Sequence, residues 1–382
     1  MDKYNIAYCE NQVVQHCSTF APHSNVAETM SIFRLHLQEP LQFPQQLDLL
    51  LKAWDQWRTE NPKETPVFLR FFLSDIANQE SLISVKQFAD CAHSFIQQAP
   101  LDANAKIVLW CYSINHVECL TIGNQYCFEH GVYKHFWTGN RQLPVGNSEE
   151  QTQEMLEQYE AELNENGMAF ENDCIRTWFL VQNVDVNYHG VVVGRKNNFD
   201  QIGLIPNTHY VTSTGIEGRC ANPHSLVLMD AYAVKGLQKN QIQFLYAKDH
   251  LNPTYEYGVT FERGTKVKYG DRSHIFISGT ASIDNKGNVL HIGDITRQVN
   301  RMLENVNALL KEASATFRDV AMAIVYLRDD ADRNEVEKAF LDDDTRDIPK
   351  VFVHAPVCRP TWLVEMECIA MVDESNPTLP NF

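Results

Sequence analysis

Apolar residues recur at the spacing of one helix face in three segments of the chain. In residues 296–311 this face consists of Met302, Leu303, Val306, Leu309 and Leu310. Asp294 precedes that segment and is a candidate N-cap. The same spacing, less regular, predicts helices over residues 150–164 and 47–57. Three amphipathic helices are therefore expected, well separated along the chain.

Runs of β-branched and aromatic residues predict strands between these helices, and the elements repeat in one order. Trp178-Phe179-Leu180 follows Met155-Leu156-Glu157 in the middle of the chain. Val325-Tyr326-Leu327 follows Met302-Leu303-Glu304 at the same interval near its end. Further similar blocks lie upstream and downstream of both pairs. Because chance matches would not keep this order, we infer an internal repeat.

A third and weaker copy occupies the N-terminal part of the chain. Its predicted strand over residues 71–76 follows the helix at residues 47–57, and a closing strand is predicted at residues 107–110. These copies divide the chain into three units, namely residues 1–121, 122–240 and 241–382.

Each unit is predicted to contain an early hairpin, a helix, a strand, a poorly patterned stretch with room for a second helix, and a closing strand. This order is typical of an α+β unit in which helices cover one face of a sheet. The other face of such a sheet is apolar and must be buried. Three units can bury these faces against one another around a pseudo-threefold axis, with clefts between neighbours. We therefore expect an intrachain pseudo-trimer that is a monomer in solution.

Charge and composition exclude several classes of partner. The 382 residues contain 49 Asp and Glu against 32 Lys and Arg, a net charge of -17, which argues against a nucleic-acid partner. The net charge is still compatible with a small anionic metabolite as ligand if a few arginines lie together at the binding site. The chain has no apolar run of membrane-span or signal-peptide length, so a cytoplasmic location without membrane contact is expected.

The sequence lacks the common motifs for cofactors and metals. It contains no GxGxxG, P-loop, HExxH, GxSxG or CxxC pattern, so nucleotide, dinucleotide, zinc and serine-hydrolase chemistry lose their main support. Most of the 10 cysteines are expected to be small buried apolar residues.

The closing strands of the three units differ at one informative position. Leu109 and Leu228 in the first two units correspond to Glu365 in the third. Because strand side chains alternate, Glu365 is expected to face a cleft between units if Met366 faces the helices. A carboxylate in a half-apolar cleft can act as a general acid near neutral pH. The alternative is a solvated carboxylate on an exposed strand face.

Candidate ligand-binding residues lie in three further segments. Cys358 and Arg359 precede the closing strand, and an arginine can bind both oxygens of a carboxylate. Alternatively, Arg359 is a surface cation and Cys358 a packing residue. Residues 212–219, rich in hydroxyls and glycine, could bring Arg219 to an anion or form an ordinary loop. Residues 255–263 suit a ring-shaped acid, or they form the first hairpin strand of the third unit.

Each unit resembles the YjgF/RidA (chorismate-mutase-like) fold, and the third resembles it best. The matching blocks are Ile277-Ser278-Gly279-Thr280-Ala281, Met302-Leu303-Glu304, Val325-Tyr326-Leu327 and the closing strand from Val364 to Ala370. The resemblance implies trimer-like packing with sites between units. Deaminating members of that family carry an arginine upstream of the closing strand, where this chain has Lys350. The resemblance therefore speaks against deamination.

The C-terminal two thirds also resemble the chorismatases, whose fold contains a RidA-like region. The matching motifs are Ser213-Thr214-Gly215-Ile216, Tyr257-Gly258 with Arg263, Ser278-Gly279-Thr280-Ala281-Ser282, and Cys358-Arg359-Pro360 with Leu363-Val364-Glu365. The resemblance implies that chorismate is converted to a hydroxybenzoate or a dihydroxycyclohexadiene carboxylate, with release of pyruvate and without a cofactor.

The same resemblance implies a role for each candidate residue. Glu365 would protonate the enolpyruvyl methylene, and Cys358 with Gly279 would favour 3-hydroxybenzoate. The substrate would be bound by Arg359, Arg263, Arg219, Tyr257, Gly279 and Thr280. Two alternatives remain: a RidA-like enamine or imine deaminase, and a noncatalytic protein that binds a small ligand.

Overall fold

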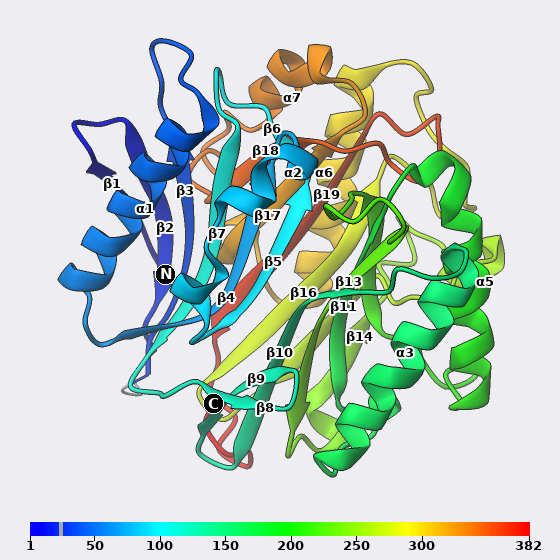
Figure 1. Ribbon diagram of the computed structural model, residues 1–382. Coiled ribbons are helices and arrows are strands. Elements are labelled where there is room, and N and C mark those ends of the chain that lie inside the picture. The colour runs from blue at the N-terminus through cyan, green and yellow to red at the C-terminus, as the bar shows by residue number, and fades with distance from the viewer. Residues whose placement is uncertain (23–25) are drawn as a thin grey trace.

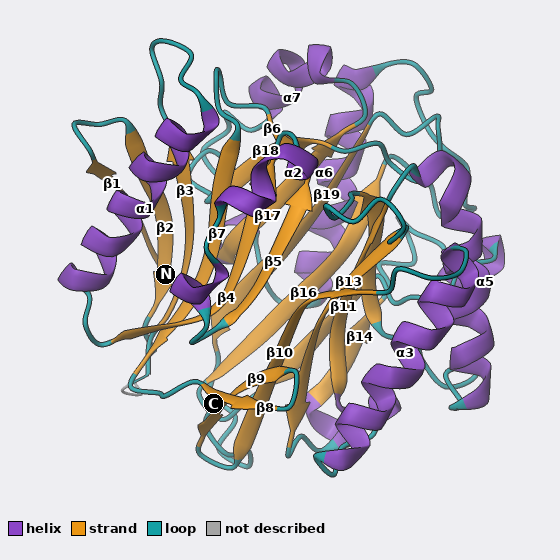
Figure 2. Cartoon of the chain, in the orientation of Figure 1, coloured by secondary structure: helices purple, strands orange, loops and turns teal. Residues whose placement is uncertain are grey.

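The computed structural model describes residues 1–22 and 26–382, and its three β-sheets lie together inside a shell of helices (Figures 1 and 2). The first sheet has the strand order β1-β2-β3-β7-β4-β5. Its strands are β1 (Asp2–Tyr8), β2 (Val13–Phe20), β3 (Glu28–Leu35), β4 (Glu64–Leu73), β5 (Ala92–Gln97) and β7 (Ile107–Asn115). Helix α1 (Phe43–Glu60) packs Leu50 and Trp54 against this sheet.

The second sheet repeats this order as β8-β9-β10-β13-β11-β12. Its strands are β8 (Leu120–Ile122), β9 (Gln125–His130), β10 (Tyr133–Gln142), β11 (Cys174–Val181), β12 (Thr212–Glu217) and β13 (Val227–Lys235). Three helices belong to this unit, namely α3 (Ser148–Glu165), α4 (Phe170–Asp173) and α5 (Val184–Gln201). In Figure 1, α3 and α5 lie side by side on the outside of the molecule.

The third sheet repeats the order again as β14-β15-β16-β19-β17-β18. Its strands are β14 (Ile242–Leu245), β15 (Gly264–Lys268), β16 (Arg272–Ala281), β17 (Val320–Leu327), β18 (Lys350–His354) and β19 (Val364–Asp373). The short strand β6 (Ala99–Pro100) of the first unit extends this sheet by pairing with β18. Helices α6 (Ile295–Glu312) and α7 (Arg333–Ala339) complete the unit, and Asp294 caps α6 through Arg297 N–H.

The remaining helical segments are short and connect the larger elements. They are α2 (Ile76–Gln79) and the 3-10 helices η1 (Glu80–Leu82), η2 (Val85–Phe88), η3 (Lys239–Gln241), η4 (Thr254–Tyr257), η5 (Phe317–Asp319) and η6 (Asp330–Asp332). In the described ranges, no helix is both long and apolar enough to span a membrane.

The three units close a ring around a shared core. Phe68 of the first unit contacts Trp137 of the second at 5.1 Å between ring centroids. A buried ion pair also crosses each interface. Arg70 and Asp230 join the first unit to the second. Arg176 and Glu367 join the second unit to the third, and Arg272 and Glu28 join the third unit to the first. The predicted α+β pseudo-trimer of three tandem units is therefore confirmed.

The structure differs from the sequence predictions in three segments. The strand expected over residues 71–76 ends at Leu73, because the chain turns into α2, where Gln97 Oε1 accepts Ile76 N–H. Residues 212–217 form strand β12 rather than a loop. Residues 254–257 form η4, and the first hairpin strand of the third unit is β14. The division at residues 121 and 240 stays a prediction.

Candidate active site

A cavity of 340 Å³ lies between the second and third units. The second unit contributes residues of α5 and β12, among them Tyr188 and Thr214. The third unit contributes Gly279 of β16, Glu365 of β19, and the segments before β15 and β19. A larger cavity of 520 Å³ lies elsewhere, but Lys239 is the only Lys or Arg among its described lining residues.

Glu365 lies in the wall of this cavity and is almost completely buried, with 5% of its surface exposed. Burial raises the pKa of its carboxyl to about 8, and the neighbouring charge of Glu367 adds to the rise. Arg263 and Arg176 lower it in part. A carboxyl with this pKa keeps its proton at neutral pH and can donate it to a bound molecule.

Gly279 makes room for this carboxyl. A Cβ at residue 279 would lie 2.1 Å from Glu365 Oε1, well inside contact distance. The register between β16 and β19 shifts between Ile277 and Thr280, so β16 has a bulge at Gly279. The glycine and the bulge together let the Glu365 carboxyl lie against the backbone of β16.

Two of the three predicted arginines line the cavity. Arg263 is 4% exposed and donates to the backbone oxygen of Asn252 at 3.2 Å. The Arg359 guanidinium lies over the ring of Trp362, 4.7 Å from its centroid. Arg219 is not among the described lining residues, and its backbone oxygen accepts Gln97 N–H from the first unit.

The remaining predicted residues occupy different positions. Cys358 lines the cavity, and burial raises the pKa of its thiol to about 12, so the thiol is protonated at neutral pH. A hydrogen bond with Tyr188 opposes that rise. Thr280 is fully buried between two lining residues of β16 and donates to Ser278 O at 2.9 Å. The side chain of Tyr257 lies outside the described residues.

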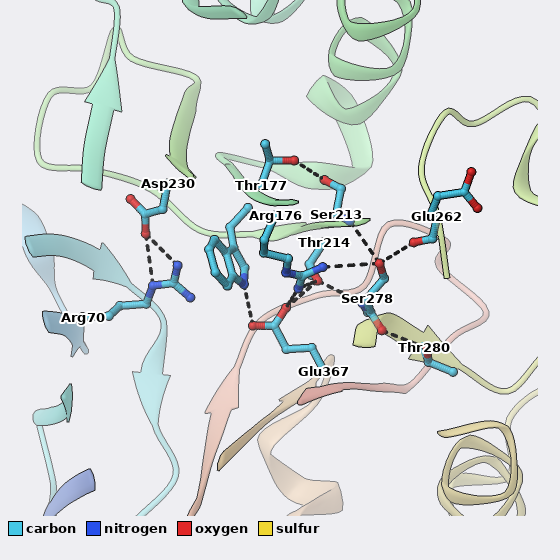
Figure 3. A network of polar contacts seen from close by, with 12 residues as sticks. Arg70, Arg176, Thr177, Ser213, Thr214, Asp230, Glu262, Ser278, Thr280 and Glu367 are labelled. Atoms are coloured by element: carbon cyan, nitrogen blue, oxygen red, sulfur yellow. Dashed lines mark hydrogen bonds and ion pairs between the residues drawn. The ribbon is translucent and has the colours of Figure 1, made fainter. Parts of the chain in front are cut away.

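A buried polar network behind the cavity was not predicted from the sequence (Figure 3). Arg176 of β11 donates to Glu367 Oε2 at 2.6 Å and to Thr214 Oγ1 at 2.5 Å. Gly279 N–H donates to Thr214 Oγ1 at 2.9 Å. The sequence did contain a signal for this network: Arg176 lies in the otherwise apolar strand from Cys174 to Val181, and a buried arginine requires a partner.

Lys350, at the position of the deaminase arginine, does not line the cavity between the second and third units. Its ammonium donates to the backbone oxygens of Thr345, Arg346 and Ile348 at 2.9 to 3.1 Å. Burial lowers its pKa to about 8. These three contacts fix the side chain of Lys350 at the start of β18.

Comparison with known sequences identifies the family through the third unit. Residues 266–372 match the family model described as endoribonuclease L-PSP. A RutC family protein of Pyrococcus abyssi is 34% identical over 105 residues, which cover 27% of this chain and 81% of that protein. The chain belongs to the RutC family. The 3-aminoacrylate deaminase RutC of Acinetobacter baylyi is 26% identical to this RutC-family chain over 99 residues, 26% of the chain and 79% of the relative.

Comparison with solved structures extends the likeness of this RutC-family chain beyond the third unit. A crystal structure of a chorismatase superposes with a TM-score of 0.63 and covers 80% of this chain and 93% of its own. The two sequences are 18% identical, so the likeness shows the fold. The chain therefore combines a RutC-family third unit with the fold of a chorismatase.

Proposed function

We propose that this chain converts chorismate to a hydroxybenzoate, or to a dihydroxycyclohexadiene carboxylate, with release of pyruvate. One observation carries the proposal: a carboxyl that keeps its proton at neutral pH shares a cavity with Arg263 and Arg359. Chorismate has two carboxylates, which suit the two guanidinium groups. Its enolpyruvyl ether breaks when the methylene carbon accepts a proton.

In the proposed mechanism, Glu365 is the general acid. It transfers its proton to the enolpyruvyl methylene, which places positive charge on the carbon that carries the ether oxygen. The bond between that oxygen and the ring then breaks more easily. A positioned acid of this kind typically contributes about 10²- to 10⁴-fold in rate. Arg263 and Arg359 hold the dianion despite the net charge of -17.

Of the two products, we favour 3-hydroxybenzoate. Its formula and that of pyruvate together contain the atoms of chorismate, so the rearrangement needs no net water. Cys358 and Gly279 both line the cavity, which supports their assignment to this branch. The diene diol would require one added water molecule.

A RutC-like deaminase is the alternative that the sequence relatives favour. Against it, Lys350 contacts three backbone oxygens and does not line the cavity. A noncatalytic protein that binds a small anion in this cavity is the third possibility.

One set of assays separates the three. Purified protein is incubated with chorismate and pyruvate is measured with lactate dehydrogenase. In parallel, ammonia release is followed from an unstable imine generated in the assay by an amino-acid oxidase. We expect pyruvate from chorismate and no acceleration of ammonia release. Absence of pyruvate above background contradicts the proposal, and binding without turnover indicates a noncatalytic protein.

A further inference from the structure

Glu367 lies two residues beyond Glu365 on β19 and on the same face of the strand. The residue is 3% exposed, and its carboxylate accepts hydrogen bonds from three residues of the second unit. Oε2 accepts from Arg176 at 2.6 Å and from the Thr214 hydroxyl, while Oε1 accepts from Trp178 Nε1 at 2.8 Å. Three donors from one neighbouring unit hold this carboxylate in a fixed position behind the cavity.

This network reaches the cavity wall directly. The Thr214 hydroxyl donates to Glu367 and accepts Gly279 N–H at 2.9 Å. Arg176 Nη1 donates to the Ser278 hydroxyl at 3.3 Å, and that hydroxyl also accepts Ser213 N–H at 3.0 Å. Strands β12 and β16 are therefore joined at the residues next to Gly279, against which the Glu365 carboxyl lies.

The charged and titratable groups around Glu365 come from several elements. Glu367 lies on its own strand, Arg176 on β11, Arg263 before β15, Tyr326 on β17, and Cys358 and Arg359 before β19. Among these groups, Glu367 and Arg176 have opposite effects on Glu365, since the carboxylate raises its pKa and the guanidinium lowers it. The carboxylate of Glu367 has the larger effect of the two, and Arg176, together with Arg263, offsets part of it.

We propose that Glu367 and Arg176 form a positioning pair, which holds Thr214 and Gly279 beneath Glu365 and balances the charge beside its carboxyl. The proposal rests on the function proposed above, because it explains how Glu365 is prepared as an acid. Neither residue is among the described residues that line the cavity, so the pair acts through Glu365 rather than on the substrate.

The test is a titration of Glu365 that needs no substrate. The protonated carboxyl band is followed by difference infrared spectroscopy across pH, and Glu365→Gln identifies the contribution of Glu365. Glu367→Gln should lower the midpoint by about one pH unit, because the carboxylate then no longer opposes Arg263 and Arg176. Arg176→Gln should raise the midpoint by a smaller amount. The double variant should have a midpoint between those of the two single variants.

Opposite shifts in the single variants, with an intermediate midpoint in the double variant, are not expected from a general disturbance of packing. Asp230→Asn is the matched control, since Asp230 forms an equally buried pair with Arg70 at the other interface of the second unit. It should leave the midpoint unchanged. If Glu367→Gln does not fold, the comparison of the double variant with Arg176→Gln still tests the proposal, because a neutral pair avoids a buried lone charge.

Two results would overturn the inference: midpoints that agree in all variants, or shifts of the same sign in both single variants. The alkaline limb of kcat/KM for chorismate should move with the infrared midpoint. If no pyruvate forms but the midpoints shift as described, the proposed function fails and the positioning role stands.

Discussion

At the scale of single residues, the protonation of Glu365 gives the chain a distinct pH dependence. Burial raises the pKa of this carboxyl to about 8, and the acid acts only while it holds its proton. We therefore expect kcat/KM for chorismate to be constant below about pH 7 and to fall tenfold per unit above pH 8. Initial rates between pH 4 and 10 check this. A profile that falls below pH 6, as for an ordinary carboxylate base, would contradict the acid role.

Gly279 provides the second residue-scale prediction. In Gly279→Ala the new Cβ would lie 2.1 Å from Glu365 Oε1, so the carboxyl must move. A displaced acid should lower kcat by about tenfold or more. Gly218→Ala is the control, because its Cβ would meet Leu180 Cβ at 3.0 Å, outside the cavity. It should affect thermal stability more than kcat, and equal kcat losses would remove the special role of Gly279.

The sequence predicted one wall of this cavity better than the other. Glu365 was found because strand alternation and comparison of the repeats both pointed to it, and Arg359 because it lies nearby in sequence. Arg176 and Tyr188 were missed, since both come from the second unit and only the assembled ring brings them to β19. Thr280 was expected at the cavity, but alternation along β16 places Gly279 and Ala281 there instead.

At the scale of elements, helix α5 ties the second unit to the segment that carries Cys358 and Arg359. Asp185 near its start forms two hydrogen bonds with Arg328, at 2.8 and 3.0 Å. Arg328 also donates to the backbone oxygen of Val357. The side chains of Arg328 and Asp185 are 18% and 43% exposed, so the pair contributes at most about 1 kcal/mol to stability. Its effect should therefore be on the geometry of the cavity.

This connection predicts how Asp185→Asn behaves. We expect KM for chorismate to rise several-fold while the melting temperature changes by less than about 2 °C. Asp200→Asn is the control on the same helix, since Asp200 pairs with Lys196 and does not line the cavity. Steady-state kinetics and thermal unfolding measure both variants. An equal rise of KM in both would show that α5 does not position this segment.

The long helices were easier to predict than the connections between elements. Residues 47–57, 150–164 and 296–311 all lie within observed helices, because an amphipathic helix repeats its pattern over several turns. A second helix was an option for the stretch that forms α5, but its bounds could not be predicted, since its polar and apolar residues show little helical periodicity. Its neighbours in the folded chain stabilise it, and these cannot be read from local spacing.

At the scale of the whole molecule, the ring of units depends on buried charges at each interface. Arg70 and Asp230 are both fully buried, so Asp230→Asn leaves an uncompensated guanidinium between the first two units. Loss of one partner of a buried pair typically costs about 3 to 5 kcal/mol. We expect a clear fall in the urea midpoint, with partial recovery in Arg70→Met/Asp230→Leu. An unchanged midpoint would show that the pair does not hold these units together.

The ring also explains why one chain suffices for a cavity between units. Each unit places its apolar sheet face in the shared core, so a second chain is not needed to cover these faces. A monomer in solution therefore stays our prediction. Of the three clefts, the one between the second and third units combines Glu365 with Arg263 and Arg359.

The most direct measurement compares pyruvate release from chorismate by the unaltered protein and by Glu365→Gln, at pH 7 and saturating substrate. Glutamine keeps the size of the side chain but cannot donate this proton, so the rate should fall by at least about 10²-fold. Glu304→Gln, an exposed change on α6, should keep the full rate. Full activity in Glu365→Gln, or no pyruvate from the unaltered protein, would contradict the assignment of this cavity.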